Sequence, residues 1–355
     1  MCHREAKFHG INRSYLLSWL AGLGDSMISR RRIVIALGAG ALANPFASFA
    51  QQQGKVWRIG FLLEGEQSVY TGRIDAFKAG MRDLGYVEGR DYVLEPRYAQ
   101  LDLARVPSLA AGLLALNVNI IVAPSTPPAQ AVLKLTRELP ILVVAVNDPV
   151  GSGFAATLSR PGGSVTGFTN GVASELFSKR LDLLRQMLPG MRGVGFLYNP
   201  DNAGDAQGLK QFEFDCAKLG FKSLRAPVRK REEIAVVFNT LQRDKAQGLM
   251  VSAAATNQAW RESITEHAAK NHIPAVYSNS IYVDAGGLLS YGTNFIDLYR
   301  RAATYVDKIL KGTKPGDLPF EQPTIFELAV NMKTAKALGI KIPDSILVQA
   351  TKVIV

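Results

Sequence analysis

Two kinds of segment alternate in residues 55–150. Short, nearly continuous apolar runs are separated by longer stretches in which apolar residues recur every three or four positions. The runs predict strands buried on both faces, and the stretches predict amphipathic helices. The predicted strands are Val56–Leu63, Tyr92–Tyr98, Asn119–Ala123 and Pro140–Val146, and the predicted helices are Thr71–Leu84, Leu103–Leu116, Pro127–Glu138. This order is typical of a parallel sheet covered by helices.

The same alternation restarts after Arg160–Thr169, a segment rich in glycine that suits a crossover between domains. Further strands are predicted at Gly193–Tyr198, Phe221–Ala226, Gly248–Ser252, Pro274–Ser278, Gly287–Tyr291 and Ile325–Asn331; further helices at Ser174–Met187, Gly204–Leu219, Arg231–Arg243, Trp260–Asn271, Phe295–Lys311 and Lys333–Leu338. The fold class is therefore α/β, with two Rossmann-like parallel-sheet domains and a ligand cleft between them.

Polar side chains follow the predicted strands, where loops at the carboxyl ends face such a cleft. The first-domain candidates are Glu64, Ser68, Tyr70, Ser125, Thr126, Asn147 and Asp148, and the second-domain candidates are Asn199, Asn202, Ser252, Asn279 and Tyr291. Ser125 and Thr126 precede a helix, so their hydroxyls and amides suit a carboxylate. Tyr70 suits an aromatic wall. The alternative for each is turn or cap chemistry, as for Asp148 before a proline.

The first 50 residues differ from the rest. Met27–Arg32 is basic, Ile33–Ala43 is apolar, and a small-residue site ends at Ala50. This is the pattern of a cleaved signal peptide over residues 27–50, and the apolar run is shorter than the roughly 20 residues of a membrane span. We therefore expect a periplasmic protein. Residues 1–26 are interpreted as a mis-annotated extension, with a genuine extension as the alternative.

Charge and cysteine content add little chemistry. The formal net charge is +11, but the basic residues are dispersed, and the densest run, Arg225–Arg231, is followed at once by Glu232 and Glu233. A solvated surface is expected rather than a nucleic-acid site. Of the two cysteines, Cys2 precedes the expected cleavage site, so no internal disulfide is predicted, and Cys216 is expected to be a buried apolar residue.

A catalytic or metal-binding set is not evident. Beyond residue 50 the only histidines, His267 and His272, lie five positions apart and do not share a helix face. Gly151-Ser152-Gly153 does not have the spacing of a nucleophile elbow. The sequence therefore predicts no enzyme activity, no bound metal and no cofactor.

Several longer stretches form a combination of motifs that is far more specific than any one of them alone. They are Arg58–Leu62 (RIGFL), Phe77–Arg90, Asp148–Gly153 (DPVGSG), Leu158–Gly167, Gly286–Gly292, Arg300–Gly312, Leu318–Thr324, Phe326–Asn331 and Lys333–Gly339. In these stretches the chain resembles the ABC-transporter substrate-binding proteins that include tryptophan- and tyrosine-binding members. The resemblance covers nearly all of residues 55–355.

The resemblance implies a type I periplasmic-binding fold in which the chain crosses between domains three times. The first domain would comprise residues 55–166 plus 292–318, and the second residues 167–291 plus 319–355. The implied protein is a monomer that captures a small organic solute by domain closure and delivers it to an ABC permease and its ATPase. The solute would be an amino acid, an aromatic or a carboxylate-bearing compound.

One departure from the family concerns the loop after Gly248–Ser252. Amino-acid-binding members tend to carry an acidic residue there, whereas this chain has only small and neutral residues over Ser252–Asn257. An unpaired buried ammonium is costly, so either the ligand is not an α-amino acid, or Asp148 or Glu64 takes that role.

Two alternative functions would use the same predicted cleft. A ligand-sensing protein would need a DNA-binding or signalling segment, and an exported hydrolase or isomerase would need a catalytic set. Neither feature is visible in the sequence.

Overall fold

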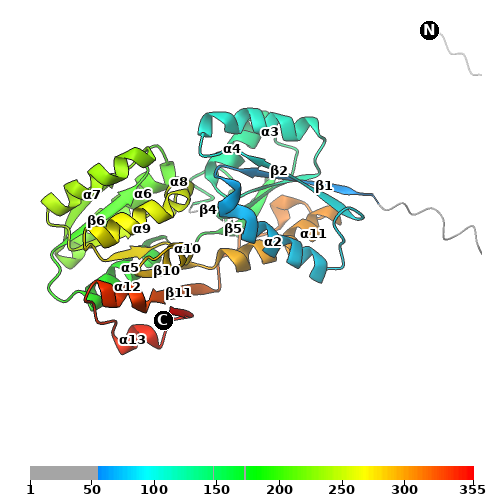
Figure 1. Ribbon diagram of the computed structural model, residues 1–355. Coiled ribbons are helices and arrows are strands. Elements are labelled where there is room, and N and C mark those ends of the chain that lie inside the picture. Colours follow the sequence, from blue (N-terminus) through cyan, green and yellow to red (C-terminus); the bar gives the residue numbers. More distant parts are fainter. Residues whose placement is uncertain (1–54, 147, 172) are drawn as a thin grey trace, which may run out of the picture. The chain divides into compact units, whose positions relative to one another are not determined.

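The computed structural model describes residues 55–146, 148–171 and 173–355 (Figure 1). The expected extension at 1–26, the expected signal peptide at 27–50 and the candidate Asn147 lie outside these residues. The strands form two sheets, and each predicted strand from the sequence pattern has a counterpart within a few residues.

The first sheet is entirely parallel, with the strand order β2-β1-β3-β4-β5. Its strands are β1 (Trp57–Leu63), β2 (Tyr92–Tyr98), β3 (Ile120–Ala123), β4 (Ile141–Val146) and β5 (Val165–Thr169). The segment Arg160–Thr169, expected to be a crossover, thus ends in an edge strand. The β-branched and aromatic residues of Val165–Thr169 favour this strand, because each is buried against the sheet.

Two pairs of helices cover this sheet. They are α2 (Gln67–Asp83) with α11 (Phe295–Leu310) on one face, and α3 (Val106–Ala115) with α4 (Thr126–Leu135) on the other. Successive strand residues alternate between these faces: Phe61 and Leu63 join the core under α2 and α11, whereas Leu62 joins the core under α3 and α4. Burial on both faces explains why the central strands β3 and β4 are apolar at every position. Below, this sheet and its four helices are called the first lobe.

The second sheet has the order β12-β11-β10-β9-β8-β6-β7. Its strands are β6 (Gly193–Tyr198), β7 (Lys222–Pro227), β8 (Gly248–Val251), β9 (Ala275–Tyr277), β10 (Leu289–Thr293), β11 (Phe326–Asn331) and β12 (Lys352–Ile354). The expectation of a parallel sheet is wrong at one pair, since β10 and β11 are antiparallel. β11 belongs to the tail, which returns from the first lobe and enters the sheet in the opposite direction.

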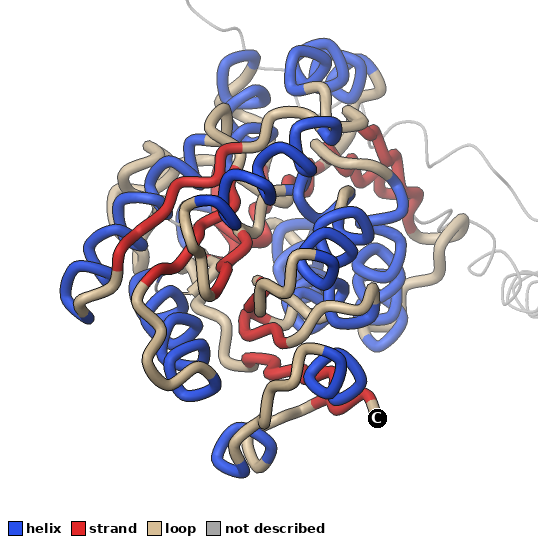
Figure 2. The backbone as a smooth tube through the Cα atoms, turned by 60° about the vertical axis from the view of Figure 1, so that its left-hand side comes forward, coloured by secondary structure: helices blue, strands red, loops and turns tan. Residues whose placement is uncertain are grey.

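Helices also cover both faces of the second sheet, and Figure 2 shows the strands lying between them. On one face lie α5 (Ala173–Met187), α6 (Ala203–Leu219), α12 (Met332–Ala337) and α13 (Asp344–Leu347), and on the other α7 (Ile234–Arg243), α9 (Arg261–Lys270) and α10 (Ile281–Asp284). The short α8 (Ala255–Ala259) follows β8. The described part of the chain also has three 3₁₀ turns, η2 (Leu103–Arg105), η3 (Arg231–Glu233) and η4 (Pro315–Asp317). The second sheet and the helices α5 to α10, α12 and α13 are called the second lobe.

The chain passes between the two sheets at three places. It leaves the first sheet after β5, returns from β10 through α11, and enters the second sheet again at β11. The passing segments are bonded to one another, since the Thr293 hydroxyl donates to the Asn170 carbonyl and the Asn294 amide donates to the Ile325 carbonyl. The domain limits inferred from the resemblance stay a prediction.

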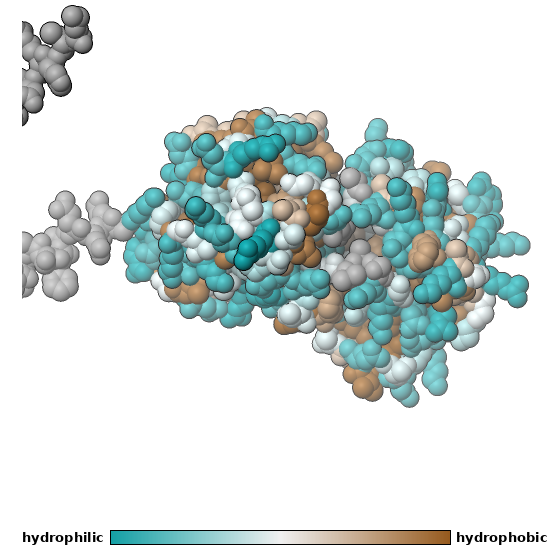
Figure 3. All heavy atoms as spheres, turned by 180° about the vertical axis from the view of Figure 1, so that it is seen from behind, coloured by the Kyte–Doolittle hydropathy of each residue, from teal (hydrophilic) through white to brown (hydrophobic). Residues whose placement is uncertain are grey.

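The surface of the described residues agrees with a solvated basic run. Arg225 pairs with the half-buried Glu213 at 2.7 Å, and Arg229 pairs with Asp201 at 3.3 Å, with both arginines exposed. The face seen in Figure 3 is covered mainly by hydrophilic side chains. Cys216 is fully buried, as predicted. Within the described part of the chain, no helix has both the length and the apolar character needed to cross a membrane.

Candidate functional site

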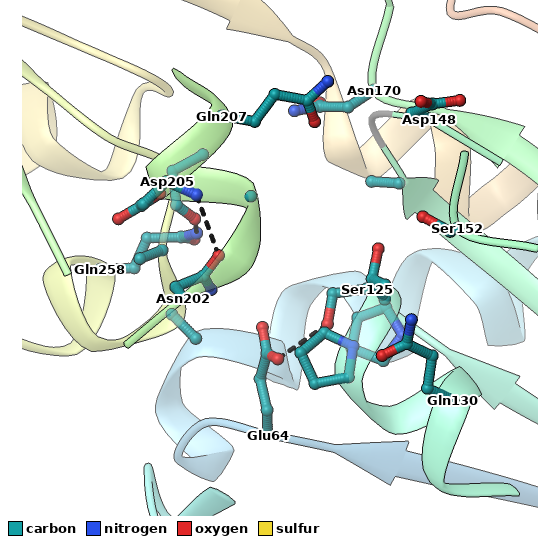
Figure 4. Close-up of a pocket in the computed structure, with 18 of the residues that line it drawn as sticks. Glu64, Ser125, Gln130, Asp148, Ser152, Asn170, Asn202, Asp205, Gln207 and Gln258 are labelled. Carbon is teal, nitrogen blue, oxygen red and sulfur yellow. Dashed lines mark hydrogen bonds between the residues drawn. The ribbon is translucent and has the colours of Figure 1, made fainter. Parts of the chain in front are cut away.

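Loops at the carboxyl ends of both sheets line one cavity of about 320 Å³ (Figure 4). In each sheet the strand order reverses once, between β1 and β3 in the first lobe and between β6 and β8 in the second. Loops diverge at such a reversal and leave a crevice, which is where open α/β sheets bind ligands. The cavity combines these two crevices.

A glutamate and a serine form the corner of the first lobe. Glu64 follows β1 directly and is only 7% exposed, and Ser125, after β3, donates its hydroxyl to Glu64 Oε2 at 2.7 Å. Burial raises the pKa of the Glu64 carboxyl, while the Ser125 hydrogen bond and the charge of Arg73 act in the opposite direction. The bond spans the reversal between β1 and β3.

Ser125 and Thr126 begin α4, but they offer a ligand fewer donors than the sequence suggests. Pro127 and Pro128 occupy the first turn and supply no N–H groups, and Ser125 makes no capping bond because its hydroxyl goes to Glu64. The amides left at this helix start are those of Ser125 and Thr126. An anion bound there would therefore meet fewer donors than at an ordinary helix N-terminus.

Arg73 is the cation of the cavity, and the sequence analysis missed it. Its Nη2 donates to Gln258 Oε1 across the lobes, since Arg73 lies on α2 and Gln258 on α8. The guanidinium also lies over two rings, 4.5 Å from the Phe295 centroid and 5.3 Å from the Tyr70 centroid. Gln258 is held in turn by a bond from its Nε2 to the Ala253 carbonyl at 2.6 Å.

A second carboxylate, Asp205, forms the corner of the second lobe. It lies in the first turn of α6, lines the cavity and is 7% exposed. Its Oδ2 accepts from the backbone N–H of Asn199 at 2.7 Å and from the Ser252 hydroxyl at 2.6 Å. Burial raises its pKa to about 6, and the charge of Glu64 acts in the same direction. The Ser252 bond spans the reversal between β6 and β8.

Polar side chains also line the end of the cavity opposite Glu64. Figure 4 places Asp148, Ser152, Asn170 and Gln207 there. Asp148 closes a turn, since its Oδ1 accepts from the Gly151 amide at 2.8 Å. The cavity is thus polar at both ends, and the small side chains of the loop after β8 also line it.

The structure brings together half of the residues predicted for the site. Those that line the cavity are Glu64, Tyr70, Ser125, Thr126, Asp148 and Asn202. Asn202 caps α6, because its Oδ1 accepts from the Asp205 amide at 3.1 Å. The contribution of any of these residues to binding stays a prediction.

Apart from Asn147, which lies outside the described residues, the other predicted residues lie away from the cavity. Ser68 is exposed on α2. Asn199, Ser252 and Asn279 are buried behind the cavity wall. Tyr291 lies in β10, stacked on Phe326 with ring centroids 6.0 Å apart. Strand-end position alone cannot separate these residues from those that face the cavity.

The buried residues behind the wall form a polar network that supports Asp205. Asn257 Nδ2 donates to the Ser252 hydroxyl oxygen at 2.9 Å, and Asn279 Nδ2 donates to the Ser278 hydroxyl oxygen at 3.3 Å. Ser252 is therefore fixed in the orientation that donates to Asp205. Within the described ranges, no cluster of three or more His, Cys, Asp or Glu side chains is arranged to hold a metal ion.

Comparison with known proteins gives consistent results. The family model described as ABC transporter substrate binding protein matches residues 64–354. A tyrosine-binding protein of Clostridioides difficile is 26% identical over 265 residues, which is 75% of this chain and 76% of that protein.

Solved structures show the same fold. A conserved domain protein from Vibrio cholerae has a TM-score of 0.79 at 26% identity, and an ABC domain from Streptococcus pneumonia in complex with L-Trp has a TM-score of 0.77 at 24% identity. Each match covers 84% of this chain and all of the other chain. The fold is that of the type I periplasmic binding proteins.

Proposed function

Because the chain belongs to the ABC transporter substrate-binding protein family, we propose that it is the extracytoplasmic solute-binding component of an ABC importer. It captures a small organic solute and delivers it to a permease driven by an ATPase. The protein acts in the periplasm as a monomer, after removal of residues 27–50 as a signal peptide. It binds its solute without converting it.

The observation that carries this proposal is that both lobes line a single cavity. Glu64 and Ser125 come from the first lobe, and Asn202 and Asp205 from the second. A cavity of about 320 Å³ suits a small molecule. A solute there would contact both lobes at once, so its binding energy would favour the closed arrangement over an open one.

Contacts between the lobes support closure on binding. Arg73 of α2 donates to Gln258 of α8, and these two helices pack against each other. These contacts would break on opening. Two lobes joined by three short segments are suited to a hinge motion of this kind.

The proposed solute is an amino acid, an aromatic compound or another carboxylate-bearing molecule. The tyrosine-binding relative supports this choice. The Thr126 hydroxyl and the backbone amides of Ser125 and Thr126 offer donors to a carboxylate, since the Ser125 hydroxyl is bonded to Glu64, and Tyr70 also lines the cavity.

The test is thermal unfolding of the purified protein with a panel of amino acids, aromatic acids, nucleosides and small carboxylates. A solute at 100 times its Kd should add about 2.7 kcal/mol to the free energy of unfolding. A saturable shift with one chemical class, together with a smaller radius of gyration in X-ray scattering, is the expected result. Chemical turnover of a panel compound would contradict the proposal and indicate an enzyme.

A further inference from the structure

The cavity carries more negative than positive charge. Among the described residues that line it, Glu64, Asp148 and Asp205 are acidic and Arg73 is basic. Arg73 is occupied, because it donates to Gln258 and lies over the Phe295 ring. Asp148 accepts the Gly151 amide in its own turn. The two carboxylates that remain, Glu64 and Asp205, are both buried.

Asp205 is the more exceptional of the two. Both of its hydrogen bonds reach Oδ2 and come from uncharged donors, the Asn199 amide and the Ser252 hydroxyl. No Lys or Arg in the described ranges forms an ion pair with it at 4.0 Å or less. A buried carboxylate without a cation is costly, and such groups occur where a ligand supplies the missing charge.

The wall beside Asp205 leaves room for that ligand. The loop after β8 contributes Ala253, Ala254 and Ala255 to the cavity. These methyl side chains carry no charge that could neutralise Asp205, and they are too small to fill the cavity. The polar network of Ser252 and Asn257 holds the carboxylate at the wall of the cavity.

We propose that the solute carries a protonated amine, and that this cation binds to Asp205, with Glu64 as the second carboxylate. This inference rests on the proposed solute-binding function and specifies the chemical class of the solute. Asp205 then supplies, from the first turn of α6, the negative charge that the loop after β8 lacks. Asn199 and Ser252 are positioning residues that hold Asp205.

The geometry is consistent with a compact ligand that has polar groups at both ends. The amine would lie near Glu64 and Asp205, and a second polar group would reach either Ser125 and Thr126 or the residues around Asp148. An amino acid or a small amine meets these conditions. A solute with only negative charge would face two buried carboxylates, of which only Glu64 has the charge of Arg73 near it.

The experiment measures binding of matched pairs by calorimetry at pH 7.5. The probes are L-tyrosine with 3-(4-hydroxyphenyl)propanoate, L-leucine with 4-methylpentanoate, and phenethylamine with 2-phenylethanol, together with ribose and with CaCl₂ alone. We expect binding of at least one amine, and binding of its amine-free partner that is at least about 10-fold weaker.

The variant Asp205→Asn keeps the size of the side chain and removes its charge. We expect it to weaken binding of the amine by about 10- to 100-fold, the range for hydrogen bonds to charged groups. Asp201→Asn is the matched control: Asp201 lies in the same loop, its side chain is 63% exposed, and it lies outside the cavity. The control should bind within twofold of the unmodified protein.

The pH dependence separates an electrostatic contact from a structural one. Since burial raises the pKa of Asp205 to about 6, amine affinity should fall as the pH drops below 6, and Asp205→Asn should reduce this dependence. The ionisable groups that interact with Asp205 are Glu64 and Tyr282, and Arg73 and Tyr70 interact in turn with Glu64. Burial raises the pKa of both tyrosines well above 10, so Glu64 is the residual titrating acid.

The possible outcomes are distinct. Binding of ribose or of an amine-free partner with equal or higher affinity would overturn the amine inference and leave the solute-binding function intact. Binding of Ca²⁺ alone, or an amine affinity unchanged in Asp205→Asn, would also overturn it. No binding by any probe would count against both proposals.

Discussion

The two lobes begin with nearly the same strand but supply their carboxylates differently. β1 contains Gly60-Phe61-Leu62 and β6 contains Gly195-Phe196-Leu197, and in each the fourth residue after the glycine begins the loop at the cavity. In the first lobe that residue is Glu64, which is itself acidic. In the second lobe it is Asn199, whose amide donates to Asp205, six residues further along the chain.

The difference shows that a sheet fixes where charge is needed but not which residue supplies it. Both carboxylates accept a serine hydroxyl from the loop across the strand reversal, Ser125 for Glu64 and Ser252 for Asp205. Glu64 also has the charge of Arg73 near it, whereas among the described residues the only charge that acts on the pKa of Asp205 is the negative one of Glu64. The second corner is therefore the one more in need of a cation.

The largest expected effect concerns the glycines of the two strands. A Cβ on Gly195 would lie 2.7 Å from Leu241 Cδ2, whereas on Gly60 the nearest atom, Leu113 Cδ2, would be 3.2 Å away. Overpacking costs about 1–3 kcal/mol. We expect Gly195→Ala to lower the free energy of unfolding by about 2 kcal/mol, and Gly60→Ala to lower it by about half as much. Urea unfolding of both variants measures this, and the reverse ranking would contradict it.

The next effect is the pH dependence of stability without ligand. Burial raises the pKa of Asp205 from 3.8 in the unfolded chain to about 6, so the folded state holds the proton more tightly. The contribution of Asp205 to the free energy of unfolding is therefore greatest below pH 4. It falls by roughly 2 kcal/mol as the pH rises to about 6. Asp205→Asn should remove most of this loss and be more stable than the unmodified protein at pH 8.

Urea unfolding at pH 5 and pH 8 measures that prediction. Asp201→Asn is again the control, and it should keep the pH dependence of the unmodified protein. A variant Asp205→Asn that is less stable at pH 8 would show that the charge of Asp205 stabilises the fold, contrary to the comparison.

A smaller effect is expected where the lobes meet. Gln258→Ala removes the acceptor of the Arg73 bond between α2 and α8. Losing a hydrogen bond to a charged group should cost the closed state about 1–2 kcal/mol, so the apparent affinity for the solute should fall about 5- to 30-fold. Arg73→Met should lower the affinity by a similar factor. In the double variant the loss of affinity should be smaller than the sum of the two single losses. X-ray scattering without ligand should report a larger radius of gyration, and strict additivity would refute a shared contact.

The smallest effects concern the two serines. Removing the hydroxyl donor in Ser252→Ala or Ser125→Ala should raise the pKa of Asp205 or Glu64, respectively, because each carboxylate loses a bond to its charged form. We expect each substitution to raise the free energy of proton dissociation from the carboxyl by about 1 kcal/mol. NMR titration of ¹³C-labelled carboxylates would report the shifts, and a Ser252→Ala variant with an unchanged Asp205 titration would contradict the assigned bond.

The fold was accessible from sequence because its determinants are local. Strands such as Gly193–Tyr198 are apolar at every position, and Gly220 ends α6 in the left-handed conformation that glycine favours. The short α8, α10, α13 and β12 lack a long periodic pattern, and they depend on packing against the second sheet. The antiparallel entry of β11 depends on the path of the tail, which no local pattern encodes.

The site was only partly accessible for a related reason. Residues directly after a strand, such as Glu64 and Ser125, are placed by the sheet and can be found by position. Asp205 lies within Asn202–Asp205, where a capping asparagine followed by an acid three residues later is typical of an ordinary helix start. Arg73 and Gln258 lie on helices and are 185 positions apart, so only the folded chain brings them together.

The three passages of the chain between the sheets also govern when each lobe can be completed. The first lobe lacks α11 until residue 310 is available, and the second lacks β11 and β12 until residues 331 and 354 are available. Neither lobe is a continuous stretch of chain, so neither can close its core while the C-terminal part is still being made. Folding must therefore wait for contacts that are distant in sequence, which makes it slow, and the two lobes should reach the native state as a single cooperative unit.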